Sequence, residues 1–133
     1  MNHIDHIGIA VKDLDISIPL FESLMNTHCY KQEVVASQNI TTAFLRTGET
    51  KIELLEDGEK DGVINKFIEK KGEGIHHIAF EVENILEEIE RMKDLGFTVM
   101  NEKPAIGADG KLVCFLHPKT TNGVLIELCQ QIK

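Results

Sequence analysis

Apolar residues alternate with polar or small ones near the start of the chain, in the stretch DHIGIAV (residues 5–11). One face of this stretch carries the large aliphatic side chains of Ile7, Ile9 and Val11. His6 lies on the opposite face, among small residues. A period of two residues is typical of a strand that is buried on one side. The sequence therefore predicts a strand over residues 3–11 whose His6 face lines a cavity.

A helical spacing of apolar residues follows and runs to about Asn26. The apolar positions are Leu14, Ile18, Phe21, Leu24 and Met25. Asp13 or Asp15 can cap this helix. Because a proline is tolerated only in the first turn, where N–H groups lack partners, Pro19 predicts a start at Asp15 or later.

The rest of the first half contains β-rich runs and one more helical pattern. Strands are predicted over residues 28–36, 41–45 and 51–55, and a connecting helix over residues 61–71. The second half repeats this order. Its predicted elements are a strand over 74–82, a helix capped by Asn84 and ended by Gly96, and strands over 97–101, 111–116 and 124–129.

Two sequence matches indicate an internal duplication. His77 in GIHHIAFEV superposes on His6 in DHIGIAV at an offset of 71 residues (77 − 6). Glu127 in LIELCQ superposes on Glu53 in KIELLE at an offset of 74 residues (127 − 53). Nearly equal offsets of about half the chain predict two copies of one βαβββ unit.

We expect the two units to form a single α+β domain over residues 1–133. Module 1 spans about residues 1–58, the connecting helix about 61–71, and module 2 about 74–133. A sheet with a helix on one face leaves its other face uncovered, so each unit can cover the other. Their inner faces would then form a cleft.

The duplicated residues His6, Glu53, His77 and Glu127 are candidate ligands of one metal ion lining that cleft. Strand parity favours His77 over His76, because His76 shares the packing face with the large apolar residues that follow it. Two imidazoles and two carboxylates suit a divalent transition metal, with coordination positions left for water or substrate.

The composition excludes several classes of partner. A net charge of −8 argues against a nucleic-acid surface, which requires basic residues. No apolar run approaches the roughly 20 residues needed to span a bilayer. Three cysteines without a CxxC spacing suit a reducing compartment. The expected location is therefore the cytoplasm, with no membrane partner.

The whole chain resembles the vicinal oxygen chelate superfamily. The stretches that carry this resemblance are DHIGIAV, KIELL, GIHHIAFEV, IGADGK, FLHPK and GVLIEL. The resemblance implies a glyoxalase/bleomycin-resistance-type fold with one divalent metal ion per site. Ni2+ or Co2+ is favoured, because short glyoxalase I chains are similar in ligand set and size, and Zn2+ or Mn2+ is possible. A homodimer is expected.

Two activities within the superfamily compete. Methylmalonyl-CoA epimerases are most similar in the surrounding residues, but they typically carry a Pro-Glu-Gln-Gly-like stretch where this chain has residues 37–40. The run 36–45 contains no carboxylate, and epimerisation needs two acid/base groups. Glyoxalase I also shows departures, because its usual arginine is Ala10 here and its usual asparagine is Asp57.

On that balance the sequence predicts a glyoxalase I (lactoylglutathione lyase) that acts in methylglyoxal detoxification. Its substrate would be the methylglyoxal–thiol hemithioacetal, with Glu127 or Glu53 as the base. The alternative is a methylmalonyl-CoA epimerase acting on an acyl-CoA, and a lesser alternative is a non-catalytic drug-binding protein. Which glutamate is the base, and whether the units pair within one chain or between chains, stays open.

Overall fold

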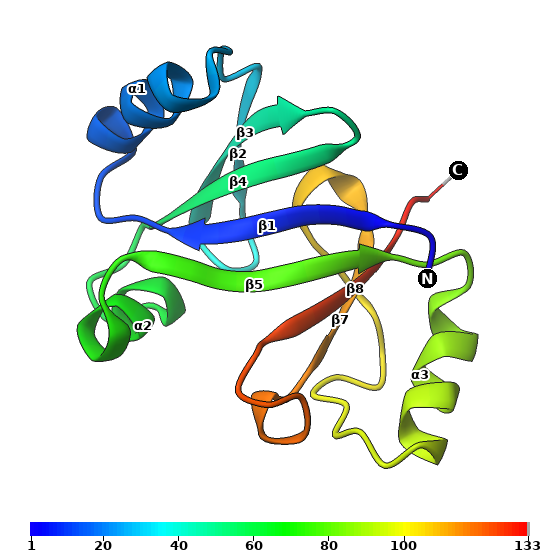
Figure 1. Cartoon of the computed structure of the whole chain (residues 1–133). Coiled ribbons are helices and arrows are strands. Elements are labelled where there is room, and N and C mark those ends of the chain that lie inside the picture. The colour runs from blue at the N-terminus through cyan, green and yellow to red at the C-terminus, as the bar shows by residue number, and fades with distance from the viewer. Residues whose placement is uncertain (133) are drawn as a thin grey trace. The chain divides into compact units, whose positions relative to one another are not determined.

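The structure, a computed structural model, describes residues 1–132. Within them the chain forms eight strands and three α-helices (Figure 1), which confirms the predicted α+β class. The chain forms two compact units. We call residues 6–76 the N-terminal unit, and residues 1–5 together with residues 77 onward the C-terminal unit. No helix among the described residues is long and apolar enough to cross a membrane.

The N-terminal unit follows the predicted order of strand, helix and three strands, and ends in the connecting helix. Its elements are β1 (Ile4–Ala10, of which residues 6–10 belong to this unit), α1 (Leu14–Met25), β2 (Lys31–Val35), β3 (Ile40–Thr47), β4 (Thr50–Asp57) and α2 (Val63–Lys71). The strands lie in the order β2-β3-β4-β1. β1 and β4 are parallel, and the other neighbours are antiparallel.

The C-terminal unit repeats this order. Its elements are β5 (Gly74–Glu81, of which residues 77–81 belong to this unit), α3 (Ile85–Asp94), β6 (Ala105–Ile106), β7 (Leu112–Leu116) and β8 (Ile126–Gln130), with short 3-10 turns at Ala108–Gly110 and Pro118–Thr120. The strands lie in the order β5-β8-β7-β6. The parallel pair is now β5 with β8. Both units therefore carry one parallel pair formed by their first and last strands.

α1 begins earlier than the sequence predicts. It starts at Leu14, with Asp13 as the N-cap, so Pro19 lies in the helix interior. The Asp13 side chain accepts a hydrogen bond from the Asp15 N–H at 2.9 Å, which fixes the start. Pro19 leaves the Asp15 carbonyl without its usual N–H partner. Both residues are exposed, so water can bond to that carbonyl, and the expected start at Asp15 or later was wrong.

Residues 97–101 do not form the predicted strand. A single bridge joins Val99 to Leu116. Beyond this bridge, the side chain of Asn101 forms hydrogen bonds with the backbone of β7. The Oδ1 of Asn101 accepts a hydrogen bond from the Phe115 N–H at 2.9 Å, and its Nδ2 donates to a carbonyl of β7 at 3.2 Å. The strand that pairs with the outer edge of β7 is instead the two-residue β6.

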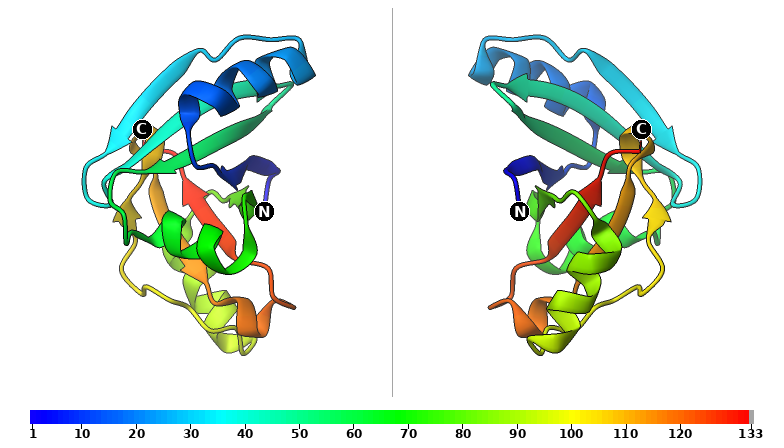
Figure 2. Two further views of the ribbon diagram at one scale, coloured as in Figure 1. Left: turned by 90° about the vertical axis from the view of Figure 1, so that its left-hand side faces the viewer. Right: turned by 90° about the vertical axis from the view of Figure 1, so that its right-hand side faces the viewer.

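Each sheet packs one face against its own helix. α1 lies along β3 and β4 (Figure 2), with Ile18, Phe21 and Met25 against a buried cluster of the sheet. α3 packs Ile85, Ile89 and Met92 against the buried residues Cys114, Leu116 and Leu128. The burial of these apolar faces stabilises each unit, and it leaves the opposite face of each sheet to carry the polar residues described next.

Candidate active site

His6 and Glu53 meet on the sheet of the N-terminal unit. The parallel pairing of β1 with β4 places His6 opposite Lys51 and Gly8 opposite Glu53, so Glu53 lies two residues along from His6's partner, on the same face. The Nδ1 of His6 is 3.1 Å from the Oε2 of Glu53. Both residues are buried, with exposed fractions of 5% and 3%. Gly8 itself places no side chain on this face.

His77 and Glu127 form the equivalent pair in the C-terminal unit. Ala79 lies opposite Glu127 in the parallel pairing of β5 with β8. The Nε2 of His77 is 3.2 Å from the Oε1 of Glu127, and both residues are 5% exposed. Phe115 lies opposite Glu127 on β7, and its ring meets the His77 ring edge-on at a centroid distance of 5.9 Å. This apolar contact restricts the orientation of the imidazole.

The donor atoms of each pair fit a divalent metal ion. Two ligands that bind one ion at about 2.1 Å and at a right angle lie about 3.0 Å apart. The separations of 3.1 Å and 3.2 Å match that geometry within each pair. Imidazole nitrogen and carboxylate oxygen are also the donors that first-row transition metals accept together. The residues of each pair therefore suit a metal ion.

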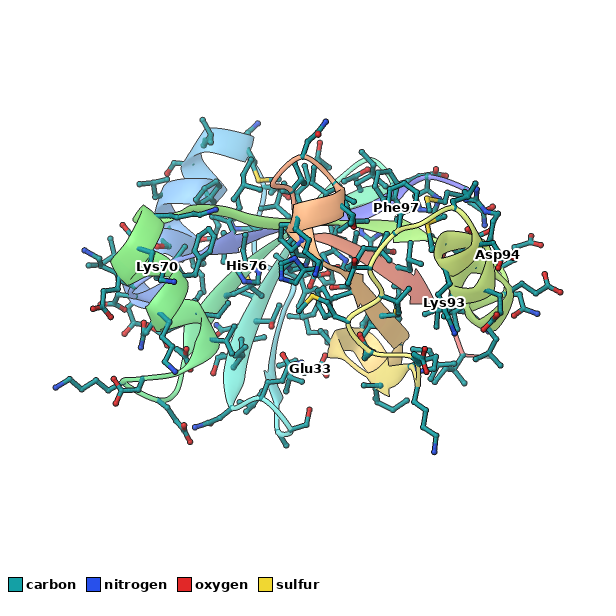
Figure 3. The ribbon with its side chains drawn as sticks, turned by 90° about the horizontal axis from the view of Figure 1, so that it is seen from below. Glu33, Lys70, His76, Lys93, Asp94 and Phe97 are labelled. Atoms are coloured by element: carbon teal, nitrogen blue, oxygen red, sulfur yellow. The ribbon has the colours of Figure 1, made fainter. Side chains whose placement is uncertain are left out.

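His76 has a different environment from His77. It is partly exposed, and its ring packs edge-on against Phe67 of α2, with the ring centroids 5.0 Å apart. Figure 3 shows His76 beside this helix. The structure thus places His77 next to a carboxylate and His76 against an aromatic ring, as the strand parity predicts.

The sequence analysis missed a buried ion pair in the C-terminal unit. The Nζ of Lys111 donates to the Oδ1 of Asp5 at 2.5 Å, and the two residues are 7% and 3% exposed. Their only signal was their place in the stretches IGADGK and DHIGIAV. Asp5 also forms a cluster of possible metal ligands with His3 and Glu81. The ammonium group on Asp5 disfavours a second cation there, because like charges repel.

The chain belongs to the Glyoxalase/Bleomycin resistance protein/Dioxygenase superfamily, whose family model matches residues 5–115. The predicted superfamily and fold are confirmed by this match. Members of the superfamily often bind a divalent metal ion, which agrees with the donor geometry of the two His–Glu pairs.

Several similar proteins are methylmalonyl-CoA epimerases. An ethylmalonyl-CoA/methylmalonyl-CoA epimerase from Cereibacter sphaeroides is 38% identical over 132 residues, which cover 98% of this chain and 98% of the relative. The methylmalonyl-CoA epimerase structure from Mycobacterium tuberculosis is 31% identical, with a TM-score of 0.93 over 98% of this chain and 89% of that one. An epimerase structure in complex with methylmalonyl-CoA and NH4+ is 34% identical, with a TM-score of 0.92 over 98% and 95%.

These comparisons correct the predicted activity. The relatives are epimerases, so the prediction of a glyoxalase I acting in methylglyoxal detoxification is wrong, and the stated epimerase alternative is the better supported one. The prediction of an enzyme agrees with the relatives, which are isomerases rather than lyases. The error came from the carboxylate-free run 36–45, which was given more weight than the similarity along the rest of the chain.

Proposed function

We propose that the chain epimerises a methylmalonyl-CoA-type acyl-CoA at its α carbon. The observation that supports this most is the pair of buried His–Glu contacts at duplicated positions, in a chain that matches an epimerase along nearly its whole length. An acyl-CoA of this type has a thioester carbonyl and a carboxylate on the same carbon. The thioester carbonyl makes the α proton acidic enough for a protein carboxylate to remove when the developing charge is stabilised.

We further propose that His6, Glu53, His77 and Glu127 together bind one divalent metal ion. Such an ion would act as a Lewis acid towards the negative charge that develops on the thioester oxygen. Ni2+ or Co2+ is the proposed metal, with Zn2+ or Mn2+ as further candidates. A homodimer also stays a prediction.

Glu127 is the proposed base. A carboxylate oxygen of Glu127 takes the proton from the α carbon, and the electron pair of that C–H bond moves into the thioester carbonyl to give an enolate. A proton then returns to the opposite face of the α carbon, which inverts the configuration. The Phe115 ring beside His77 would help to exclude water from this side of the site.

Inversion needs a second acid/base group, and Glu53 is the proposed one. Residues 36–45 offer no carboxylate, whereas Glu53 is a buried carboxylate already held beside His6. Glu53 would have to loosen from the metal ion to carry a proton, and its protonated carboxyl would then give that proton to the face opposite Glu127. The same two groups would act in reverse on the other epimer, since epimerisation is reversible.

Proton exchange tests this activity directly. The protein is incubated with methylmalonyl-CoA of one configuration in D2O, and NMR follows deuterium entry at the α carbon while chiral chromatography follows inversion. We expect both at rates far above the protein-free background. The hemithioacetal of methylglyoxal and glutathione, tested in parallel, should give no thioester product. Absence of exchange and inversion in a protein loaded in turn with each of the four metals would overturn the proposal.

A further inference from the structure

A row of basic side chains crosses the sheet of the N-terminal unit next to His6. His6 lies opposite Lys51 in the pairing of β1 with β4, and Lys51 lies opposite Arg46 in the pairing of β4 with β3. Residues directly opposite each other on paired strands point to the same face. The row therefore leads from the candidate metal ligand towards the edge strand β2.

β2 adds a third cation to this face. Lys31 lies opposite Phe44, which in turn lies opposite Glu53. The Nζ of Lys31 is 4.9 Å from the centroid of the Phe44 ring. Its charge is partly compensated, because it lies 3.3 Å from the Oε1 of Glu33, which Figure 3 labels on β2. Of these cations, Arg46 is the one best placed to bind an external anion.

An aromatic ring, rather than a carboxylate, holds Arg46. Its Cζ lies 5.0 Å from the centroid of the Tyr30 ring, and its Nη2 is 3.4 Å from the Tyr30 Oη. Arg46 is exposed, and within residues 1–132 it forms no ion pair. The contact with Tyr30 restrains the guanidinium and engages one of its N–H groups. A guanidinium has five N–H groups, so others remain to bind a phosphate through two parallel hydrogen bonds.

We propose that Arg46, supported by Tyr30 and Lys31, binds the phosphate groups at the nucleotide end of an acyl-CoA. This inference rests on the proposed epimerase function. Measured across the sheet from β1, β3 lies two strand spacings away and β2 lies three. These distances are roughly 10 Å and 15 Å. The arm between the thioester and the diphosphate of coenzyme A contains two amide units and spans on the order of 15 Å when extended. A thioester held near His6 would thus place its phosphates near Arg46.

The overall charge makes a local cation group more important. The chain carries a net charge of −8, which repels a polyanion such as coenzyme A at long range. Binding therefore depends on cations placed where the phosphates lie. The lysines on α2 are separate from this row, because they lie on a helix rather than on β2, β3 or β4.

The test compares Arg46→Gln with Arg91→Gln on two substrates. Arg91 lies on α3, far along the sequence from Arg46, and pairs with Glu88 at 2.9 Å. Replacing it by glutamine changes the net charge by the same amount as Arg46→Gln. The substrates are methylmalonyl-CoA and the matching pantetheine thioester, which lacks every phosphate. We expect Arg46→Gln to raise KM for methylmalonyl-CoA roughly 10- to 100-fold, with kcat within about twofold, because a hydrogen-bonded charge pair is lost. KM for the pantetheine thioester should stay within about twofold.

Arg91→Gln should leave both KM values unchanged, and Arg46→Lys should lie between wild type and Arg46→Gln. An unchanged KM for methylmalonyl-CoA in Arg46→Gln, or an equal rise for the pantetheine thioester, would overturn the phosphate site while leaving the epimerase function intact. Calorimetry with free coenzyme A separates the two proposals further. A protein that does not turn over methylmalonyl-CoA, yet loses coenzyme A affinity only in Arg46→Gln, would retain the phosphate site and lose the epimerase assignment.

Discussion

The Nδ1 of His6 lies 3.1 Å from the Oε2 of Glu53, because the register of two parallel strands offsets these residues by two positions and so keeps them on one face, with Gly8 opposite the glutamate. His77 and Glu127 repeat this relationship at 3.2 Å. The duplication seen in the sequence is therefore also present in the strand register. Each half supplies one nitrogen and one oxygen donor at a spacing that suits adjacent metal ligands, and this shared geometry underlies the first two predictions.

His77→Ala should abolish metal binding, whereas His76→Ala should retain it. His77 is buried against Glu127, whereas His76 packs on Phe67. Metal analysis of each protein after gel filtration should give about one equivalent per chain for wild type and His76→Ala, and none for His77→Ala. His76→Ala should unfold at a lower urea concentration because it loses an aromatic contact. Metal lost from His76→Ala and kept by His77→Ala would contradict the assignment, and the 3.2 Å contact would then be a hydrogen bond.

Glu127→Gln and Glu53→Gln should separate proton removal from inversion. Glutamine keeps an oxygen that can bind the metal but cannot accept the proton, so Glu127→Gln should slow turnover by roughly 10²- to 10⁴-fold. When the substrate is the epimer whose proton Glu127 removes, Glu53→Gln should slow deuterium exchange less than Glu127→Gln does. It should still slow inversion, because the second acid/base group is lost. NMR exchange and chiral chromatography on the same samples measure the two rates. If Glu127→Gln retains most of the wild-type exchange rate, Glu127 is not the base.

The sequence predicts the contacts within each His–Glu pair better than the activity. The two-residue period of a strand separates His77 from His76, and the duplication matches His77 with His6; the structure then shows His77 beside Glu127. The Asp5–Lys111 ion pair could not be predicted, since its partners lie far apart in the chain and belong to no periodic pattern. The activity was also missed, because the proposed metal-binding residues do not specify a substrate, and the proposed phosphate-binding residue Arg46 belongs to no motif.

The errors in secondary structure arise from side chains that substitute for backbone groups. Apolar residues at 97–101 suggest a strand, but the Asn101 side chain makes the hydrogen bonds that a strand backbone would make. Pro19 suggests a later helix start, but the Asp13 cap and the exposure of Asp15 permit the earlier one. Both effects depend on local hydrogen bonds and solvent access, which residue periodicity does not report.

Pro19→Ala should stabilise the protein. The substitution supplies an N–H that can donate to the Asp15 carbonyl and removes a ring from the helix interior, where proline costs up to about 3 kcal/mol relative to alanine. Because the helix already accommodates Pro19, we expect a gain of about 1–2 kcal/mol in the free energy of unfolding, measured with urea. Ser23→Ala, at another exposed position of α1, should change it by less than about 0.7 kcal/mol. A lower stability in Pro19→Ala would show that the proline conformation aids this helix.

Cys114 should make the protein less stable at alkaline pH. Burial raises the pKa of its thiol, so the folded state holds the proton at pH values where the unfolded state, with a thiol pKa of roughly 8.5, has released it. The stability from this group is complete below the unfolded pKa and is lost as pH rises towards the folded pKa, at up to about 1.4 kcal/mol per pH unit. Urea unfolding at pH 7 and pH 9.5 should show a smaller decline for Cys114→Val than for wild type. Leu116→Val, a buried substitution on the same strand without a titrating group, should lower stability equally at both pH values. An unchanged decline in Cys114→Val would mean that other groups cause the alkaline loss.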